Sequence, residues 1–319
     1  MHDVGRYPRM AEGTMGVSVS WFRLVGWCAG LSWLFLATAA PAATAADAAK
    51  VPSLDHVIVV IMENKNLDQV ARAPYVSSLV TNGASFSAYH AIAHPSQPNY
   101  LALWSGSTQG VTSNECPLRG VPWSRENLGH LCERAGITWR AYCEDLPTAG
   151  SAACQSSVGE YARKHAPWTN FDNLDHSNER PYTDLARDIA AGRLPSLAFV
   201  IPNNNNNTHN RRVPYGDAWL AGNLPAMIDA VGPHGVVLLT WDENDHGPTN
   251  QILTVAAGGA VKAGFVSARE VNHFTLLRTI CDALALSPPG LAAREAPITD
   301  IWKEPVVTPD DSSKRSSQP

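Results

Sequence analysis

Two pairs of oxygen-donating side chains in this 319-residue chain stand directly after apolar, strand-like runs. The pairs, with the runs before them, are Glu63 and Asn64 after 55–62, and Asp242 and Glu243 after 236–241. The carboxyl ends of parallel strands lie along one edge of an open α/β sheet, so both pairs can meet there. A lone Glu-Asn pair is more often a helix cap or loop contact. Adjacent carboxylates at a second strand end, however, are unfavourable unless they are solvated or bind a cation. Together the pairs predict a divalent metal site.

Ser96 lies in the segment HPSQPNY, just before Pro98, which can occupy the first turn of a helix expected over 98–104. The free N–H groups and the positive dipole end of a helix stabilise a phosphate. Serine at a helix start is usually only an N-cap, but Asn99 one turn later can donate its amide to a phosphate oxygen. We therefore expect Ser96 to be a nucleophile and a metal ligand, and Asn99 to bind substrate.

Three histidines near these motifs are candidate proton donors. His94 lies two residues before Ser96, His209 follows five consecutive asparagines at 203–207, and His273 precedes a helical pattern. A loop histidine such as His94 is by itself more often structural, and His209 and His273 can each equally be structural. An imidazole with an ordinary pKa of about 6.5 suits general acid catalysis. We expect these histidines to protonate a leaving group, with activity highest below neutral pH.

The two ends of the chain are expected to lie outside the folded domain. Three arginines precede the apolar run 24–40, and the small residues 43–45 after it form a cleavage site typical of an export signal over 1–46. The run is short for a membrane span. The polar tail 305–319 is expected to be disordered. The protein is therefore expected to be secreted or periplasmic, with one domain over 47–304 and no transmembrane span after cleavage.

The charge balance excludes some partners. The whole chain has 24 basic and 29 acidic residues, and without the leader the net charge is about −6. An acidic chain of this kind offers no extended basic surface for nucleic acid or anionic lipid headgroups. A phosphorylated substrate must then be held by a cation or by a local site.

Five cysteines follow the leader. In an oxidising compartment we expect pairs between sequence neighbours, Cys116 with Cys132 and Cys143 with Cys154, because both pairs bracket loop-rich segments. Cys281 lies in a helical pattern and reads as a buried small hydrophobic residue. No CxxC spacing supports a zinc site, which is the competing interpretation.

Strand-like and helix-like segments alternate along the chain, which predicts an α/β domain with a mainly parallel sheet and helices on both faces. The expected strands are 55–62, 85–90, 137–142, 196–201, 236–241 and 252–255. The expected helices are 74–81, 98–104, 125–135, 182–191, 219–230 and 274–284.

The order of motifs resembles the bacterial phosphoesterase family of the alkaline phosphatase superfamily. The motifs are ENxxxDQ, HPSxPNYLALxSGxT, CxEDLP, YARKHAPWxNF, FVIPN followed by His, GDAWL, TWDEND, NHFxLLRTI and PITDIW. They run from about Leu54 to Trp302, and they are most similar to those of secreted acid phosphatases of the mycobacterial type, whose relatives include nonspecific phospholipases C. The resemblance implies an alkaline-phosphatase-like fold.

The resemblance also implies residue roles. Metal ligands are implied at Glu63, Asn64, Ser96, Asp242 and Glu243. Ser96 is the implied nucleophile, Asn99 a phosphate contact, and His209 and His273 active-site histidines. Relatives usually carry acidic residues in the loop before the histidine. Here Asn205, Asn207 and Asn210 occupy that stretch, so we expect one divalent cation rather than two. Oxygen-rich ligation favours Mg²⁺, Ca²⁺ or Mn²⁺ over Zn²⁺.

These expectations combine into a secreted, metal-dependent acid phosphatase that hydrolyses phosphate monoesters through a phosphoserine intermediate. Its partner would be a small phosphorylated substrate, with phosphoinositides among the candidates. Two alternatives use the same residues: a phosphodiesterase or phospholipase C, and an exported binding protein of the same fold that has lost turnover.

Overall fold

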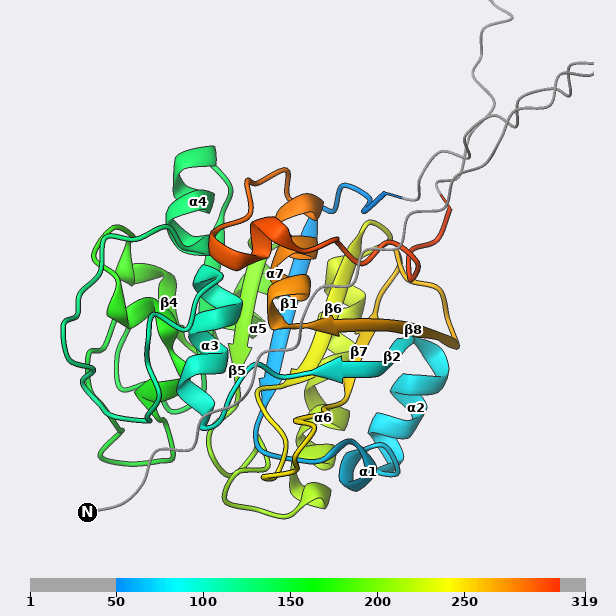
Figure 1. Ribbon diagram of the computed structural model, residues 1–319, viewed down its shortest axis with the longest axis horizontal. Helices are drawn as coiled ribbons and strands as arrows, with labels where there is room; N and C mark the ends of the chain where they lie inside the picture. The colour runs from blue at the N-terminus through cyan, green and yellow to red at the C-terminus, as the bar shows by residue number, and fades with distance from the viewer. Residues whose placement is uncertain (1–49, 305–319) are drawn as a thin grey trace, which may run out of the picture. The chain divides into compact units, whose positions relative to one another are not determined.

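The computed structural model describes residues 50–304, so the expected export signal over 1–46 and the expected tail over 305–319 lie outside the described residues. These residues form a sheet of eight strands in the order β4-β3-β5-β1-β6-β7-β2-β8 (Figure 1). The strands are β1 (His56–Met62), β2 (Ala84–His90), β3 (Trp139–Cys143), β4 (Glu179–Pro181), β5 (Leu197–Ile201), β6 (Gly235–Trp241), β7 (Thr254–Ala257) and β8 (Phe265–Asn272). Strand β7 runs antiparallel to both neighbours, β6 and β2, and every other pair is parallel. The expected mainly parallel sheet is confirmed.

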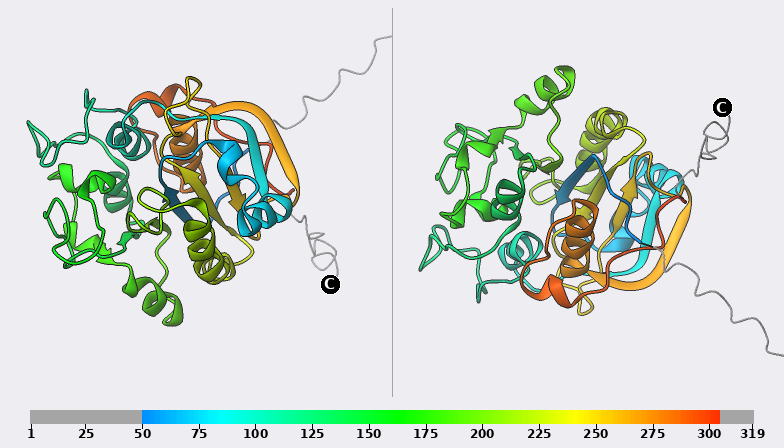
Figure 2. Two further views of the ribbon diagram at one scale, coloured as in Figure 1. Left: turned by 90° about the horizontal axis from the view of Figure 1, so that it is seen from below. Right: turned by 90° about the horizontal axis from the view of Figure 1, so that it is seen from above.

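Helices cover both faces of this sheet, as expected (Figure 2). They are α1 (Leu67–Val70), α2 (Pro74–Asn82), α3 (Ser96–Ser105), α4 (Leu128–Ala135), α5 (Thr183–Ala190), α6 (Val213–Val231) and α7 (His273–Ala283), with short 3₁₀ turns at η1 (Arg163–His165), η2 (Pro167–Asn170), η3 (His176–Asn178) and η4 (Gly290–Arg294). Helix α3 packs against α7 on one face, and α2 packs against α6 on the other. Within residues 50–304, no helix combines the length and the apolar character that crossing a membrane requires.

The central strands are buried because helices cover them from both sides. Every residue of β5 and β6 is buried, and in β1 only His56 is partly exposed. Such strands read as unbroken apolar runs, which is why the sequence located them. Strand β8 was missed because it is an edge strand in which exposed residues such as Glu270 interrupt the apolar pattern. Strand β4, three residues at the other edge and ending in Pro181, was missed too.

Both disulfides expected from sequence spacing are wrong. Cys116 pairs with Cys154, with a Cα–Cα distance of 5.8 Å, whereas Cys132, Cys143 and Cys281 are free and buried. Cys132 lies in α4 and Cys143 in β3, and both elements direct these side chains into the core. The two loop cysteines are therefore left to pair with each other. The expectation that Cys281 is a buried small hydrophobic residue is confirmed.

Candidate active site

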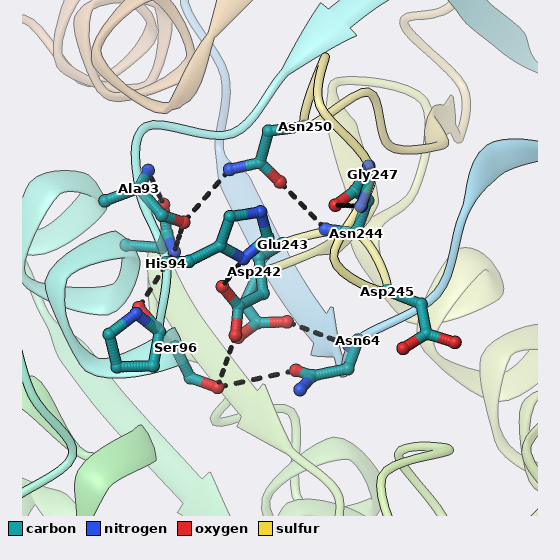
Figure 3. Close-up of polar contacts among 12 residues, drawn as sticks. Asn64, Ala93, His94, Ser96, Asp242, Glu243, Asn244, Asp245, Gly247 and Asn250 are labelled. Atoms are coloured by element: carbon teal, nitrogen blue, oxygen red, sulfur yellow. Dashed lines mark hydrogen bonds and ion pairs between the residues drawn. The ribbon is translucent and has the colours of Figure 1, made fainter.

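The two expected donor pairs meet because β1 and β6 are adjacent, parallel and in register, with Met62 beside Trp241. The residues that follow leave the sheet side by side at its carboxyl edge (Figure 3). The Asp242 amide donates to the Met62 carbonyl at 3.0 Å, and the Asn64 amide donates to Asp242 Oδ1 at 3.1 Å. Strand pairing therefore fixes the relative positions of Glu63, Asn64, Asp242 and Glu243.

Ser96 lies between these pairs. Its Oγ is 3.1 Å from Glu63 Oε2, 3.1 Å from Glu243 Oε1 and 3.4 Å from Asn64 Oδ1. The residue is only 1% exposed. It is the first residue of α3, after Pro95 at the N-cap, so the helix begins two residues earlier than expected. The hydroxyl thus lies both at a helix N-terminus and within hydrogen-bond distance of three side-chain oxygens.

Two residues with left-handed backbone conformations support this geometry. Asn64 has φ of 46°, and the β-branched Thr208 has φ of 78°, which is unusual for its type. Thr208 Oγ1 donates to the Glu63 carbonyl at 2.7 Å. A Cβ on Gly216 of α6 would lie 2.4 Å from Thr208 Cγ2, so only glycine lets the helix approach this closely. Strain of this kind concentrates at functional sites.

The loop after β6 is tied to the loop before α3. Asn250 Nδ2 donates to the Ala93 carbonyl at 3.0 Å, and Asn250 Oδ1 accepts from the Asn244 amide at 2.9 Å (Figure 3). His94, about one third exposed, contacts Glu243 Oε2 through Nδ1. The expected proton donor His94 therefore lies at the site, paired with one of its carboxylates.

The three carboxyl groups around Ser96 repel one another. Burial raises the pKa of Asp242 well above its usual range, and the charges of Glu63 and Glu243 raise it further. Burial and the Glu63 charge also raise the pKa of Glu243, although His94 opposes them. Burial alone would raise the pKa of Glu63, but the nearby His165 lowers it to about 2. A divalent cation bound among these three carboxyl groups would offset their mutual repulsion.

The donor set fits a divalent cation. Asp242 Oδ2 is buried and has no hydrogen-bond partner among the described residues, which leaves one oxygen free for a ligand. In that part of the chain no three His, Cys, Asp or Glu side chains form a complete ligand group by themselves. The Asn64 amide oxygen and Ser96 Oγ would therefore have to complete the coordination, and both are oxygen ligands suited to Mg²⁺, Ca²⁺ or Mn²⁺.

Two residues beside Glu63 were not assigned to the site from the sequence. Tyr100 donates its hydroxyl to Glu63 Oε1 at 2.5 Å, and His165 Nε2 lies 3.0 Å from the same oxygen. The two rings stack, with centroids 5.0 Å apart. Both lie in motifs that carry the family resemblance, and Tyr100 follows Ser96 by four residues, one helical turn. That spacing could have placed Tyr100 at the site, whereas nothing in the pattern around His165 does so.

His273 does not have the general-acid geometry expected of it. It is buried, its Nδ1 lies 3.0 Å from the Tyr89 hydroxyl, and its Nε2 lies 2.7 Å from the Asp242 carbonyl. Burial lowers its pKa to about 4. Neither ring nitrogen is free to protonate a leaving group, so His273 acts as a positioning residue for the Asp242 backbone.

Asn99 holds the loop before α3 rather than facing the Ser96 hydroxyl. Its Oδ1 accepts from the amides of Ile92 at 2.9 Å and Ala93 at 3.0 Å. Its Nδ2 donates to the carbonyls of Ala93 at 2.8 Å and Pro95 at 3.4 Å. All of its polar atoms are thus engaged with the backbone, and the expected phosphate contact is replaced by a positioning role.

His209 lies on the loop after β5 and is exposed. Its Nδ1 lies 2.7 Å from Asn210 Oδ1, and its Nε2 lies 3.5 Å from Lys164 Nζ. No hydrogen bond among residues 50–304 joins His209 to Ser96 or to the three carboxylates. Its role as proton donor stays a prediction.

The family model of the phosphoesterase family matches residues 69–282. A phosphatidylinositol-3-phosphatase of Mycobacterium tuberculosis is 39% identical over 259 residues, which cover 80% of this chain and 85% of that protein. A probable acid phosphatase of Kluyveromyces lactis is 29% identical over 261 residues, which cover 75% of this chain and 62% of that protein.

Solved structures show the same fold at low identity. A protein of the alkaline phosphatase superfamily from Vibrio parahaemolyticus aligns with a TM-score of 0.56 at 11% identity, over 76% of this chain and 71% of that one. Murine ectonucleotide pyrophosphatase/phosphodiesterase 5 aligns with a TM-score of 0.53 at 11% identity, over 78% of this chain and all of that one. The resemblance inferred from the motifs is confirmed, and the chain belongs to the phosphoesterase family.

Proposed function

We propose that this protein is a metal-dependent phosphomonoesterase of the acid phosphatase type, with Ser96 as its nucleophile. The observation that carries the proposal is the position of Ser96 Oγ, 3.1 Å from both Glu63 and Glu243 at the start of α3, beside the unpartnered Asp242 Oδ2. Relatives named as phosphatases at 39% and 29% identity support the reaction class.

Glu63, Asn64, Asp242 and Glu243, with Ser96 Oγ, are the residues that would hold one divalent cation. When bound, the cation supplies positive charge that lowers the pKa of the serine hydroxyl and offsets charge on the phosphoryl oxygens. Ser96 Oγ attacks phosphorus, and the bond from phosphorus to the leaving alcohol breaks. The serine proton passes to a neighbouring carboxylate, for which Glu243 Oε1 at 3.1 Å has the right position.

The leaving alcohol needs a proton, and two of the three expected histidines remain available for it. His94 and His209 both have an accessible ring, whereas both nitrogens of His273 are engaged. Water then attacks the phosphoserine and releases phosphate, so that Ser96 regains its proton. Because the donor must be a protonated imidazole, we expect turnover to be highest below neutral pH.

We also propose that the protein is exported. The Cys116–Cys154 disulfide supports this, because such bonds persist in oxidising compartments. The mycobacterial relative is named as a phosphatidylinositol-3-phosphatase. Phosphorylated polyols are therefore the first substrate class to test.

The test compares p-nitrophenyl phosphate with bis-p-nitrophenyl phosphate for the wild type and Ser96→Ala. We expect the wild type to prefer the monoester, and Ser96→Ala to lose at least about a thousandfold in kcat. Ser105→Ala is the matched control, because this buried serine of α3 bonds only the backbone of Leu101 and Ser107 and the side chain of Gln109.

Chelation followed by metal add-back tests the cation. Full turnover after stringent chelation would remove the metal from the mechanism. A preference for the diester would favour the phosphodiesterase alternative, and wild-type protein that cleaves neither substrate would favour the binding-protein alternative. A rate that stays flat from about pH 5 to 9 would contradict a protonated imidazole as the donor.

A further inference from the structure

A polar cavity of about 530 Å³ lies beside the start of α3. One lining residue is Asn114. It accepts a hydrogen bond at 3.0 Å from the backbone amide of Gln97, which is the residue directly after Ser96. The Cys116–Cys154 disulfide forms part of the wall. Another part of the wall comes from the loop after β5, which carries His209. The cavity is therefore next to the nucleophile but is formed by residues outside the carboxylate cluster.

Lys164 is a cation in this wall without a carboxylate partner. It makes no ion pair within residues 50–304, and its Nζ lies 3.5 Å from His209 Nε2. Among the described residues that line the cavity, Glu160 is the one carboxylate, and it accepts instead from Asn210 Nδ2 at 2.9 Å. A half-buried lysine beside neutral amides can readily accept an anionic partner.

The position of Lys164 relates the cavity to the reaction. Lys164 directly precedes His165, whose Nε2 is 3.0 Å from Glu63 Oε1, and the other oxygen of Glu63 is 3.1 Å from Ser96 Oγ. These contacts fix the segment that carries Lys164 to the carboxylate cluster, so the lysine and the cavity that it lines lie beside the cluster that holds Ser96. A leaving group whose only polar group is the released hydroxyl would give Lys164 no anionic partner.

We propose that this cavity binds the leaving group, and that Lys164, with His209, binds a second phosphate carried by that leaving group, which leaves His94 as the proton donor of the proposed reaction. The inference rests on the proposed phosphomonoesterase function and narrows its substrate class. The preferred substrates are monoesters of polyols that carry another phosphate. The polar lining residues Asn114, Asn204 and Asn210 supply hydrogen-bond partners for the remaining hydroxyl groups.

The test uses two substrates that differ in one glycerophosphoryl group, which carries the second phosphate. These are inositol 3-phosphate and glycerophosphoinositol 3-phosphate, whose second phosphate is a diester that a phosphomonoesterase leaves intact. We expect the wild type to favour the second substrate by about tenfold in kcat/KM, a typical worth for one charge-assisted contact. Lys164→Gln should reduce this ratio to about one, and Lys164→Arg should keep most of it.

Lys262→Gln is the control for loss of one positive charge, because Lys262 bonds the Asp300 carbonyl and lies outside this cavity. Its ratio should equal that of the wild type. A wild-type ratio near one, or a Lys164→Gln variant that slows both substrates equally, would overturn the inference. Should Lys164→Gln fail to fold, raising the ionic strength for the wild type replaces it. The ratio should fall as salt screens the contact, and a constant ratio counts against the inference.

Failure of the proposed function has a different signature. Wild-type protein that releases no phosphate from either inositol substrate or from p-nitrophenyl phosphate contradicts the phosphomonoesterase proposal itself. Hydrolysis of all three that depends on Ser96, with no preference between the inositol substrates, contradicts only the assignment of the cavity.

Discussion

The proposed site has two halves that are made in different ways. The carboxylate half (Glu63, Asn64, Ser96, Asp242 and Glu243) follows directly from two strand ends and one helix start, and all of its members except Asn64 are buried. The loop half (Asn114, Lys164, His209 and the Cys116–Cys154 disulfide) comes from segments between the elements of the sheet, and its residues are exposed or half-buried. A rigid half suits bond cleavage, and a loop half suits selection of the leaving group.

The largest effect that separates the halves is expected from Asp242→Asn. The variant should lose at least about a thousandfold in kcat, or about 4 kcal/mol of transition-state stabilisation, because it weakens the proposed cation site. The same change should stabilise the metal-free protein at neutral pH. Burial and two neighbouring carboxylates raise the pKa of Asp242, so its ionised form opposes folding as pH rises, and an amide does not.

Turnover of p-nitrophenyl phosphate and thermal unfolding in chelator measure the two parts of this prediction. Asp300→Asn is the control, because Asp300 also has one buried oxygen without a partner but lies in the segment after η4, where it accepts from Ser267. Loss of activity together with a lower unfolding temperature would show that Asp242 is chiefly structural.

The carboxylate half was predicted from sequence because its signals are local. Apolar runs that stop abruptly at Glu63 and Asp242 mark strand ends, and the parallel sheet places such ends on one edge. What could not be derived was contact at atomic scale. The pattern places Asn99 and His273 near the site equally well, and only packing shows that their polar atoms are already engaged.

Apart from His209, the loop half was missed because it has no periodic pattern. His165 and Lys164 lie in the short turn η1 within a long segment between β3 and β4. Cysteine spacing gave two wrong disulfides, because whether a cysteine faces the core or a loop depends on the finished fold. Residues from such segments come together only through tertiary structure.

Removal of the disulfide by Cys116→Ser with Cys154→Ser is expected to act on the loop half. The bond joins residues 38 apart, and the loop-entropy relation gives up to about 4 kcal/mol of stability for a loop of that size. Denaturant unfolding should show this loss, and kcat for p-nitrophenyl phosphate should change much less. Reductant should reproduce the effect in the wild type and have no effect on the double variant. Equal loss of kcat would mean that the disulfide supports the carboxylate half as well.

A pH-dependent anchor of the loop half is expected at Glu179. This buried residue accepts from the Tyr161 hydroxyl at 3.2 Å, and its carbonyl accepts from the Gly150 amide at 3.0 Å. Burial raises its pKa from 4.5 to about 7. A raised carboxyl pKa gives stability that is fully present below about 4.5, declines as pH rises to about 7, and is constant above that.

The decline for this one group is about 3 kcal/mol. Glu179→Gln should remove this decline. The free energy of unfolding of the variant should therefore rise relative to that of the wild type between about pH 4.5 and 7. Glu270→Gln removes the same charge at an exposed position, so its free energy of unfolding should change with pH in parallel with that of the wild type across that range. Urea unfolding at several pH values measures the difference, and parallel curves for Glu179→Gln and the wild type would contradict the assignment. Glu179 would therefore make the loop half most stable at acidic pH.

The smallest effect is expected where the halves meet, at Tyr100. Its hydroxyl donates to Glu63 in the carboxylate half, and its ring stacks on His165, which adjoins Lys164 in the loop half. Tyr100→Phe keeps the stack and removes one charge-assisted hydrogen bond, so we expect about a tenfold loss in kcat with little change in KM.

Tyr142→Phe is the matched control, because that buried hydroxyl donates to Asp188 instead. Equal kinetics for the two variants would show that the Glu63 contact has no catalytic weight. A changed preference between the inositol substrates in Tyr100→Phe alone would show that the two halves are coupled through this ring.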